Sequence, residues 1–112
     1  MMTTATGTET VTVLRLAGDI SPSDMDEVIR ELTELALSNH NKVILNFRQV
    51  KHVSLGAISK LAERSLRFRG LGGDVKLVGL IPYVANLFKL VGAFSHFDIA
   101  ADEEEAVSRF RN

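Results

Sequence analysis

His52 and Ser54 are the two side chains whose types come nearest to a nucleophile and its general base. A serine hydroxyl becomes nucleophilic when a histidine takes its proton and a third group holds the imidazole in place. Two residues on an extended segment point to similar sides, but that spacing alone fixes no hydrogen bond between them. No third member of such a triad accompanies them. The sequence therefore predicts a protein without enzymatic activity.

Metal and phosphate chemistry also lack the residues they need. The three histidines, His40, His52 and His96, are not spaced as metal ligands, and the chain has no cysteine. The glycine-rich residues 70–73 precede a predicted strand and lack the Lys-Ser/Thr pair of a phosphate-binding loop, so they are interpreted as a turn. We expect neither a metal site nor a cofactor.

A phosphoaccepting aspartate of the receiver-domain type is also not expected. Such a domain needs an acidic pair after its first strand and an aspartate at the end of its third. Asp19 stands alone after the first predicted strand, and the candidate strand end holds Asn46, whose amide is not a phosphoacceptor. The polar side chains at these positions are expected only to bond the loops around them.

Charge argues against direct binding to nucleic acid. Thirteen basic and fourteen acidic residues give a net charge of -1, so no overall field attracts the chain to phosphates. Lys60, Arg64 and Arg67 form a basic stripe at helical spacing, but Glu63 interrupts it and no aromatic stacking platform accompanies it. The stripe is interpreted as a solvated helix face or, if functional, as a contact for another protein.

Hydrophobic periodicity predicts four strands alternating with four helices. The strands are expected at residues 10–16, 42–47, 74–80 and 96–99. The helices are expected to start near Ser21, Leu55, Pro82 and Asp102. The signals are an N-cap residue or a proline at the start, or an apolar stripe at helical spacing. Residues 48–53 are interpreted as a link between a strand and a helix.

This alternation is typical of an α/β domain whose helices cover the faces of a central sheet. With 112 residues the chain fits one core. We expect a single domain over residues 10–112, with a mixed sheet of about four to five strands and about four helices. Residues 1–9 are expected to form a flexible tail or an edge strand. The apolar run at residues 42–47 predicts a central strand.

A cytoplasmic location is expected. Residues 1–10 are polar and threonine-rich and lack the basic and apolar regions of a signal peptide. The longest apolar stretches are far shorter than the roughly 20 residues needed to cross a bilayer, so no membrane insertion is expected. The absence of cysteine is compatible with a reducing compartment.

Three segments carry a resemblance to a known family. LRLAGDIS, from Leu14, ends an apolar strand on a glycine, an acid and an apolar residue. KVILNFRQVKHVSLGAISKL, from Lys42, leads from an apolar strand into a helix through Ser54 and Gly56. GGDVKLVGLIPYVANLFKLVG, from Gly72, contains a strand, a turn and a helix that ends at glycine. Through these segments the chain resembles the STAS domains of anti-sigma factor antagonists, from about Thr10 to Phe110.

The resemblance has departures at the positions where the family carries chemistry. Ser21 and Val53 replace aspartates, and Asn46 replaces an acid near the strand end. Leu55 stands in the place of the second serine of the family's Asp-Ser-Ser-Gly motif. Only Ser54 and Gly56 of that motif are retained. The best-preserved segment of the resemblance, from Gly72 to Gly92, supports the fold more than the chemistry.

The resemblance implies that the chain binds an anti-sigma factor of the serine kinase type. It also implies that serine phosphorylation ends this binding and that a serine phosphatase restores it. Ser54 is then the candidate phosphoacceptor, and the same residue is expected to cap the helix that follows it. The candidates for the partner-binding rim are Asp19, Ser21, Gly56, Ser59 and Lys60.

Other assemblies stay open for such a domain. Without phosphorylation, it fits a STAS scaffold in a stress-signalling complex or the soluble subunit of a lipid-transport ABC system, and a homodimer is also possible. All of the regulatory interpretations need the turn before Leu55 to be exposed, with the hydroxyl of Ser54 accessible within it.

Overall fold

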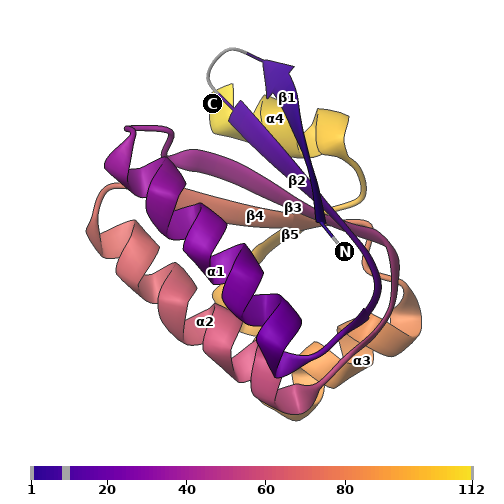
Figure 1. The fold of residues 1–112 in the computed structure, drawn as a ribbon. Helices are drawn as coiled ribbons and strands as arrows, with labels where there is room; N and C mark the ends of the chain where they lie inside the picture. The colour runs from indigo at the N-terminus through magenta and orange to yellow at the C-terminus, as the bar shows by residue number, and fades with distance from the viewer. Residues whose placement is uncertain (1, 9–10, 112) are drawn as a thin grey trace.

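Within the part of the chain that the structure describes, five strands form one mixed sheet, and their order in the sheet follows their order in the chain (Figure 1). The computed structural model describes residues 2–8 and 11–111. The strands are β1 (Met2–Thr8), β2 (Val11–Ile20), β3 (Lys42–Val53), β4 (Asp74–Val78) and β5 (Asp98–Ala100). β1 is antiparallel to β2, whereas the pairs β2–β3, β3–β4 and β4–β5 are parallel. The predicted α/β fold with a mixed sheet is confirmed, and β3 is its central strand.

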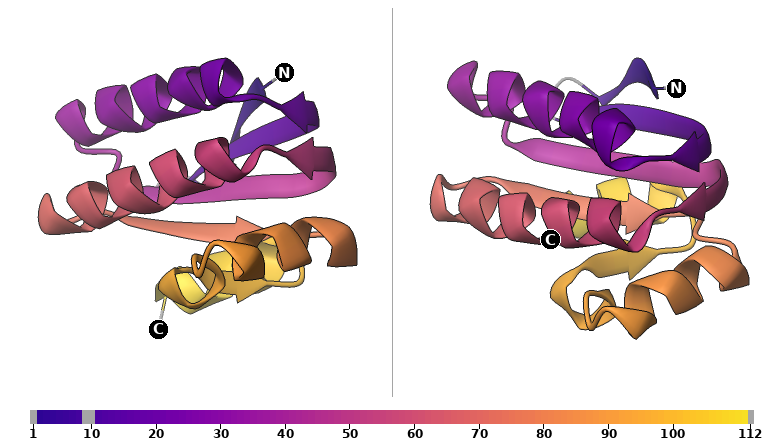
Figure 2. Two further views of the ribbon diagram at one scale, coloured as in Figure 1. Left: turned by 90° about the horizontal axis from the view of Figure 1, so that it is seen from below. Right: turned by 60° about the horizontal axis from the view of Figure 1, so that its bottom comes forward.

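The helices cover both faces of this sheet unequally. They are α1 (Pro22–Leu37), α2 (Leu55–Gly70), α3 (Pro82–Leu90) and α4 (Glu103–Arg111), with a short 3-10 helix, η1, at Phe94–His96. α1 and α2 run side by side along one face of the sheet, and α3 lies at the end of that same face (Figure 2). α4 packs against the opposite face. No helix within the described residues is long and apolar enough to span a membrane.

Two clusters of buried side chains correspond to the two faces. Alternate residues of a strand point to opposite faces, so Val43, Leu45 and Phe47 of β3 join the larger core under α1, α2 and α3. Ile44 points the other way, into a smaller core that Ala106 of α4 closes. The larger core therefore holds most of the buried apolar surface and fixes α1 and α2 on the sheet.

The prediction that residues 48–53 form a link was wrong, because β3 continues through them to Val53. Only Val50 and Val53 of this extension are buried, a spacing of three residues instead of two. The pairing with β2 shifts register twice here, and β3 has one extra residue at each shift. Bulges of this kind break the two-residue alternation of a strand, which explains why the pattern was missed.

Other element ends also differ from their predicted positions. β2 runs on to Ile20, four residues beyond its predicted end. β4 stops at Val78, because Gly79 follows with φ +74°, outside the range of a strand. The last strand lies later than predicted, at Asp98–Ala100, because residues 94–96 form η1 instead. The segment expected to be a tail or an edge strand contains β1.

Candidate functional site

Ser54 lies at the turn from the end of β3 into α2. Its backbone N–H donates to the carbonyl of Ile20, 3.0 Å away, at the end of the neighbouring strand β2. Its hydroxyl oxygen accepts a hydrogen bond from the backbone N–H of Ala57 at 3.1 Å, so Ser54 is the N-cap of α2. The residue is partly exposed, and Leu55 and Gly56 beside it are exposed. The turn is therefore a surface feature.

The start of α1 lies next to the start of α2. Because β2 and β3 are parallel neighbours, both helices leave the sheet at the same edge, where Ile20 pairs with Val53. A Cβ on Gly56 would lie 4.0 Å from the ring of Pro22, so glycine leaves open space between the first turns. Lys60 of α2 donates to Asp26 of α1 at 2.9 Å. Two helix N-termini, each with a positive dipole end, are thus held together at this edge.

Ser21 caps α1 through a reciprocal capping box. The backbone N–H and hydroxyl of Ser21 both donate to the carboxylate of Asp24 at 2.9 Å, and the Asp24 N–H donates back to the hydroxyl oxygen at 3.1 Å. The backbone and side-chain hydrogen bonds from Ser21 lower the pKa of Asp24 below its ordinary value. Ser21 stands where the resemblance placed an acid, and Asp24 brings a carboxylate to the same turn.

The six residues singled out from the sequence all lie at or near this edge. Asp19 is exposed at the end of β2, opposite His52 of β3. Ser59 is exposed on the second turn of α2, and Lys60 follows it. The structure therefore brings Asp19, Ser21, Ser54, Gly56, Ser59 and Lys60 to one end of the molecule, where two strands give way to two helices.

Tyr83 was not predicted as part of this edge. It lies in the first turn of α3, and its hydroxyl is 2.9 Å from Nδ1 of His52, with the two rings stacked at a centroid distance of 5.8 Å. Tyr83 is 51% exposed and Leu55 is 45% exposed. Its position just after Pro82 was the available signal, since α3 follows a strand parallel to β3 and begins at the same edge of the sheet.

The structure does not pair Ser54 with His52. The hydroxyl oxygen of Ser54 bonds the helix backbone, and the ring of His52 bonds Tyr83 instead. No three histidine, aspartate or glutamate side chains come together as metal ligands within residues 2–8 and 11–111. Beside the partly exposed Ser54, the side chains of Leu55 and Tyr83 are exposed.

The STAS domain family model matches residues 2–106 of the chain. The chain belongs to the STAS domain family. The match spans every strand and helix described above except the last turns of α4.

Individual proteins are similar to the chain at low sequence identity. BtrV of Bordetella bronchiseptica, provisionally named an anti-sigma factor antagonist, is 22% identical over 96 residues, which cover 86% of this chain and 83% of BtrV. The phosphorylated form of the Bacillus cell fate determinant SpoIIAA superposes with a TM-score of 0.73 at 20% identity, covering 99% of this chain and all of that one. An anti-sigma factor antagonist of Mycobacterium paratuberculosis gives a TM-score of 0.80 at 17% identity, covering 100% and 96%.

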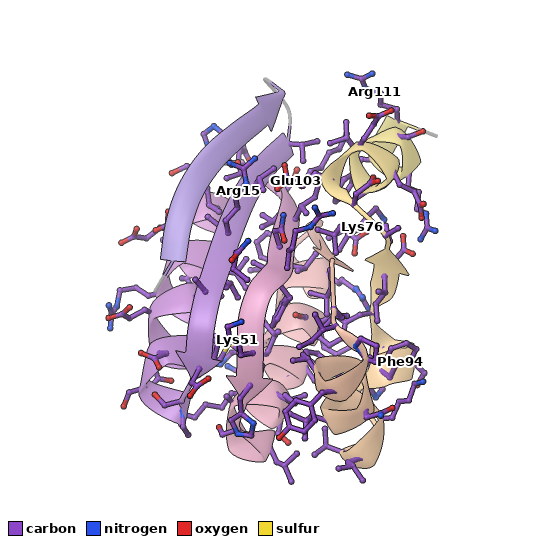
Figure 3. The ribbon with its side chains drawn as sticks, turned by 90° about the vertical axis from the view of Figure 1, so that its right-hand side faces the viewer. Arg15, Lys51, Lys76, Phe94, Glu103 and Arg111 are labelled. Atoms are coloured by element: carbon purple, nitrogen blue, oxygen red, sulfur yellow. The ribbon has the colours of Figure 1, made fainter. Side chains whose placement is uncertain are left out.

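Asn46 departs from the STAS pattern for a reason that the structure explains. Its side-chain amide donates to a carboxylate oxygen of Glu103 at 2.6 Å, and its own oxygen accepts the backbone N–H of Arg48 at 2.8 Å. Arg15 of β2 forms two hydrogen bonds of 2.8 Å to the same carboxylate (Figure 3). The bonds from Arg15, and then that from Asn46, lower the pKa of Glu103 despite its partial burial. An amide at position 46 can donate to Glu103, whereas an acid would repel it.

Asn46→Asp is therefore expected to lower the free energy of unfolding by about 1–2 kcal/mol at pH 7, because two carboxylates would share one site. One of them takes up a proton more readily in the folded state, so its pKa rises there. The loss should shrink as the pH falls below about 5, where that proton restores a donor. Urea unfolding of both proteins from pH 4 to pH 7 measures the difference.

Asn86→Asp is the matched control for this change. Asn86 is exposed on α3, away from Glu103, and the same substitution there should alter stability by less than about 0.5 kcal/mol at every pH. A stability loss in Asn46→Asp that does not vary with pH would show that carboxylate repulsion is not its cause.

Proposed function

We propose that this STAS domain is a regulatory protein of the anti-sigma factor antagonist type, which binds a serine kinase type of anti-sigma factor through the edge around Ser54. The observation that carries the proposal is the partly exposed Ser54 at the N-cap of α2, with Leu55 and Tyr83 exposed nearby. Exposed aromatic and aliphatic side chains around a small polar centre are typical of protein contact surfaces. The domain acts by binding and performs no catalysis.

Phosphorylation of Ser54 is the proposed switch. A phosphoserine carries about -1.5 to -2 charges, and the free N–H groups and dipole of a helix N-terminus stabilise them. The α1 terminus beside it adds a second positive dipole end. A partner packed against Leu55 would have to desolvate this charge, at an edge that already carries Asp19 and Asp24, and would therefore be released. A serine phosphatase would restore binding.

Ser54 variants separate binding from stability, because serine and aspartate are both good N-caps. Ser54→Ala is expected to cost about 1 kcal/mol of stability and to leave partner binding intact, since the partner needs a small uncharged side chain there. Ser54→Asp should keep its stability within about 0.5 kcal/mol and weaken partner binding about 30-fold or more, as a lost hot spot of about 2 kcal/mol would. Calorimetric titration with a kinase-type anti-sigma factor from the same genome measures the affinities.

The matched control is Ser108→Asp, which places the same charge on an exposed serine of α4, on the other face of the sheet. It should bind the partner as the unmodified chain does.

Incubation with the kinase and ATP should add one phosphate to the native chain and none to Ser54→Ala. Phosphate on another residue, or full binding by Ser54→Asp, would overturn the switch. Stable purification with an ABC ATPase would favour the transporter-associated role.

A further inference from the structure

A groove lies between α1 and α2 at the ends of these helices remote from Ser54. Its volume is about 350 Å³, and its floor and walls are mostly apolar. The side chains that form them are Ile29, Leu32 and Ala36 of α1, Phe68 of α2, and Leu71 just after the end of α2. Phe68 lies fourteen residues along α2 from Ser54, or about 21 Å at the rise of a helix. The groove is therefore separate from the candidate partner-binding edge.

The groove carries positive charge on one side. Arg64 and Arg67 of α2 line it, and no acidic side chain does. Arg64 makes no ion pair with any described residue, and Arg67 has only Glu63 of its own helix, at 3.6 Å and largely exposed. Because an exposed pair of this kind is weak, both guanidinium groups are available to an anion at the mouth of the groove.

Leucine side chains extend this apolar surface into solvent. Leu37, at the end of α1, is 84% exposed and lines the groove, as does Leu71, which is 75% exposed after the end of α2. Folding does not cover these side chains, and a ligand with an apolar body would. A few polar groups beside a concave apolar lining are typical of small-molecule sites, which measure about 300–1,000 Å³.

We propose that this groove binds a medium-chain fatty acid, with its acyl chain along the apolar walls and its carboxylate at Arg64 and Arg67. Guanidinium groups pair with carboxylates through two parallel hydrogen bonds. The volume lies at the small end of the range for ligand sites, which suits one acyl chain.

Dodecanoate, titrated into the full chain below its micelle-forming concentration, tests the site. Saturable binding of one molecule is expected by calorimetry, with amide shifts in a nitrogen-15 NMR spectrum centred on Leu32, Ala36 and Phe68. Decanoate should bind about 15-fold more weakly, because it lacks two methylenes and each buried methylene contributes about 0.8 kcal/mol. Dodecyltrimethylammonium, which has the same tail and the opposite charge, should bind at least about fivefold more weakly.

Variants locate the binding. Arg64→Gln with Arg67→Gln changes two exposed side chains without risk to the fold, and it should weaken dodecanoate about tenfold. Arg30→Gln is the matched control, since Arg30 is exposed on α1 but does not line the groove, and it should have no effect.

Ala36→Phe should fill the groove and abolish binding, with circular dichroism checking the fold. Ser54→Asp should bind dodecanoate normally, which separates this site from the proposed switch.

Several results would overturn the proposal. These are an absence of saturable binding, equal binding of the cationic amphiphile, or NMR shifts that centre elsewhere. Sedimentation that shows a dimer, lost in Ala36→Phe, would assign the groove to a second copy of the chain. A groove that ignores dodecanoate and binds an acidic amphipathic peptide would belong to a partner protein.

Discussion

Gly79→Ala is expected to lower the free energy of unfolding by about 3 kcal/mol. Gly79 has φ +74°, which costs a residue with a Cβ about 1–2 kcal/mol. An added Cβ would also lie 3.1 Å from the backbone nitrogen of Arg48 in the central strand, too close for either backbone to adjust without strain. Guanidinium chloride unfolding followed by circular dichroism measures the loss.

Gly18→Ala isolates the contribution of the dihedral angle. Gly18 has φ +82°, but nothing lies within 4 Å of the Cβ that alanine would add. It should therefore cost only about 1–2 kcal/mol. The difference between the two variants gives the cost of crowding between β3 and the turn after β4. Equal losses would show that Arg48 moves aside freely.

Lys76→Ala is expected to cost about 3 kcal/mol near pH 7. The Nζ atom of Lys76 donates to Asp74 and Asp98 at 3.0 Å each, and it lies 4.4 Å from the ring centroid of Phe110. Lys76 itself is only 7% exposed, so its removal leaves two carboxylates near each other without their shared cation. Breaking buried pairs costs about 3–5 kcal/mol, and the partial exposure of both aspartates places the loss at the lower end.

The pH dependence of this loss follows from Asp98. Burial alone would raise its pKa, but the hydrogen bond and charge of Lys76, with the charge of Arg109, lower it below the ordinary value. A carboxyl whose pKa is lowered in the folded state stabilises the protein at pH values above its unfolded-state pKa of about 3.9. That stabilisation is lost as the pH falls through the folded-state pKa. The difference in the free energy of unfolding between Lys76→Ala and the native chain should therefore become smaller below about pH 4.

Lys76→Met provides the control for side-chain volume. Methionine keeps most of the apolar stem that packs beneath α4 but not the charge. If it is as destabilising as alanine, the ion pairs dominate. If it restores most of the stability, packing against Phe110 accounts for most of the loss in Lys76→Ala, and the electrostatic explanation is wrong.

The sequence predicts the alternation of strands and helices well, because the signals for it are local. Ser21 before Pro22, and Asp102 before Glu105, are cap patterns: the backbone N–H of Asp24 donates to Ser21, and that of Glu105 donates to Asp102. Both hydrogen bonds form within three residues. The extension of β3 could not be predicted in this way. Its bulges result from the pairing with β2. The register between two strands cannot be read from the hydrophobic pattern of either strand alone.

The candidate site was only partly predictable for a similar reason. Ser54 could be found because its capping role and the family motif both lie within a few residues. The contact between Tyr83 and His52 joins residues 31 positions apart, and it depends on where α3 meets the sheet. The pairing of Asn46 with Glu103 spans 57 positions, so the sequence alone showed only that an acid was missing.

The placement of α4 implies that the protein opens in stages. This helix covers the smaller core, which has six buried members among residues 11–111, while the larger core has 22 in the same range. Elements with few buried contacts unfold locally at low free energy, well before the whole domain does. Amide hydrogens of α4 should thus exchange with solvent faster than those of β3. Such fluctuations would bare the second face of the sheet while the edge around Ser54 keeps its shape.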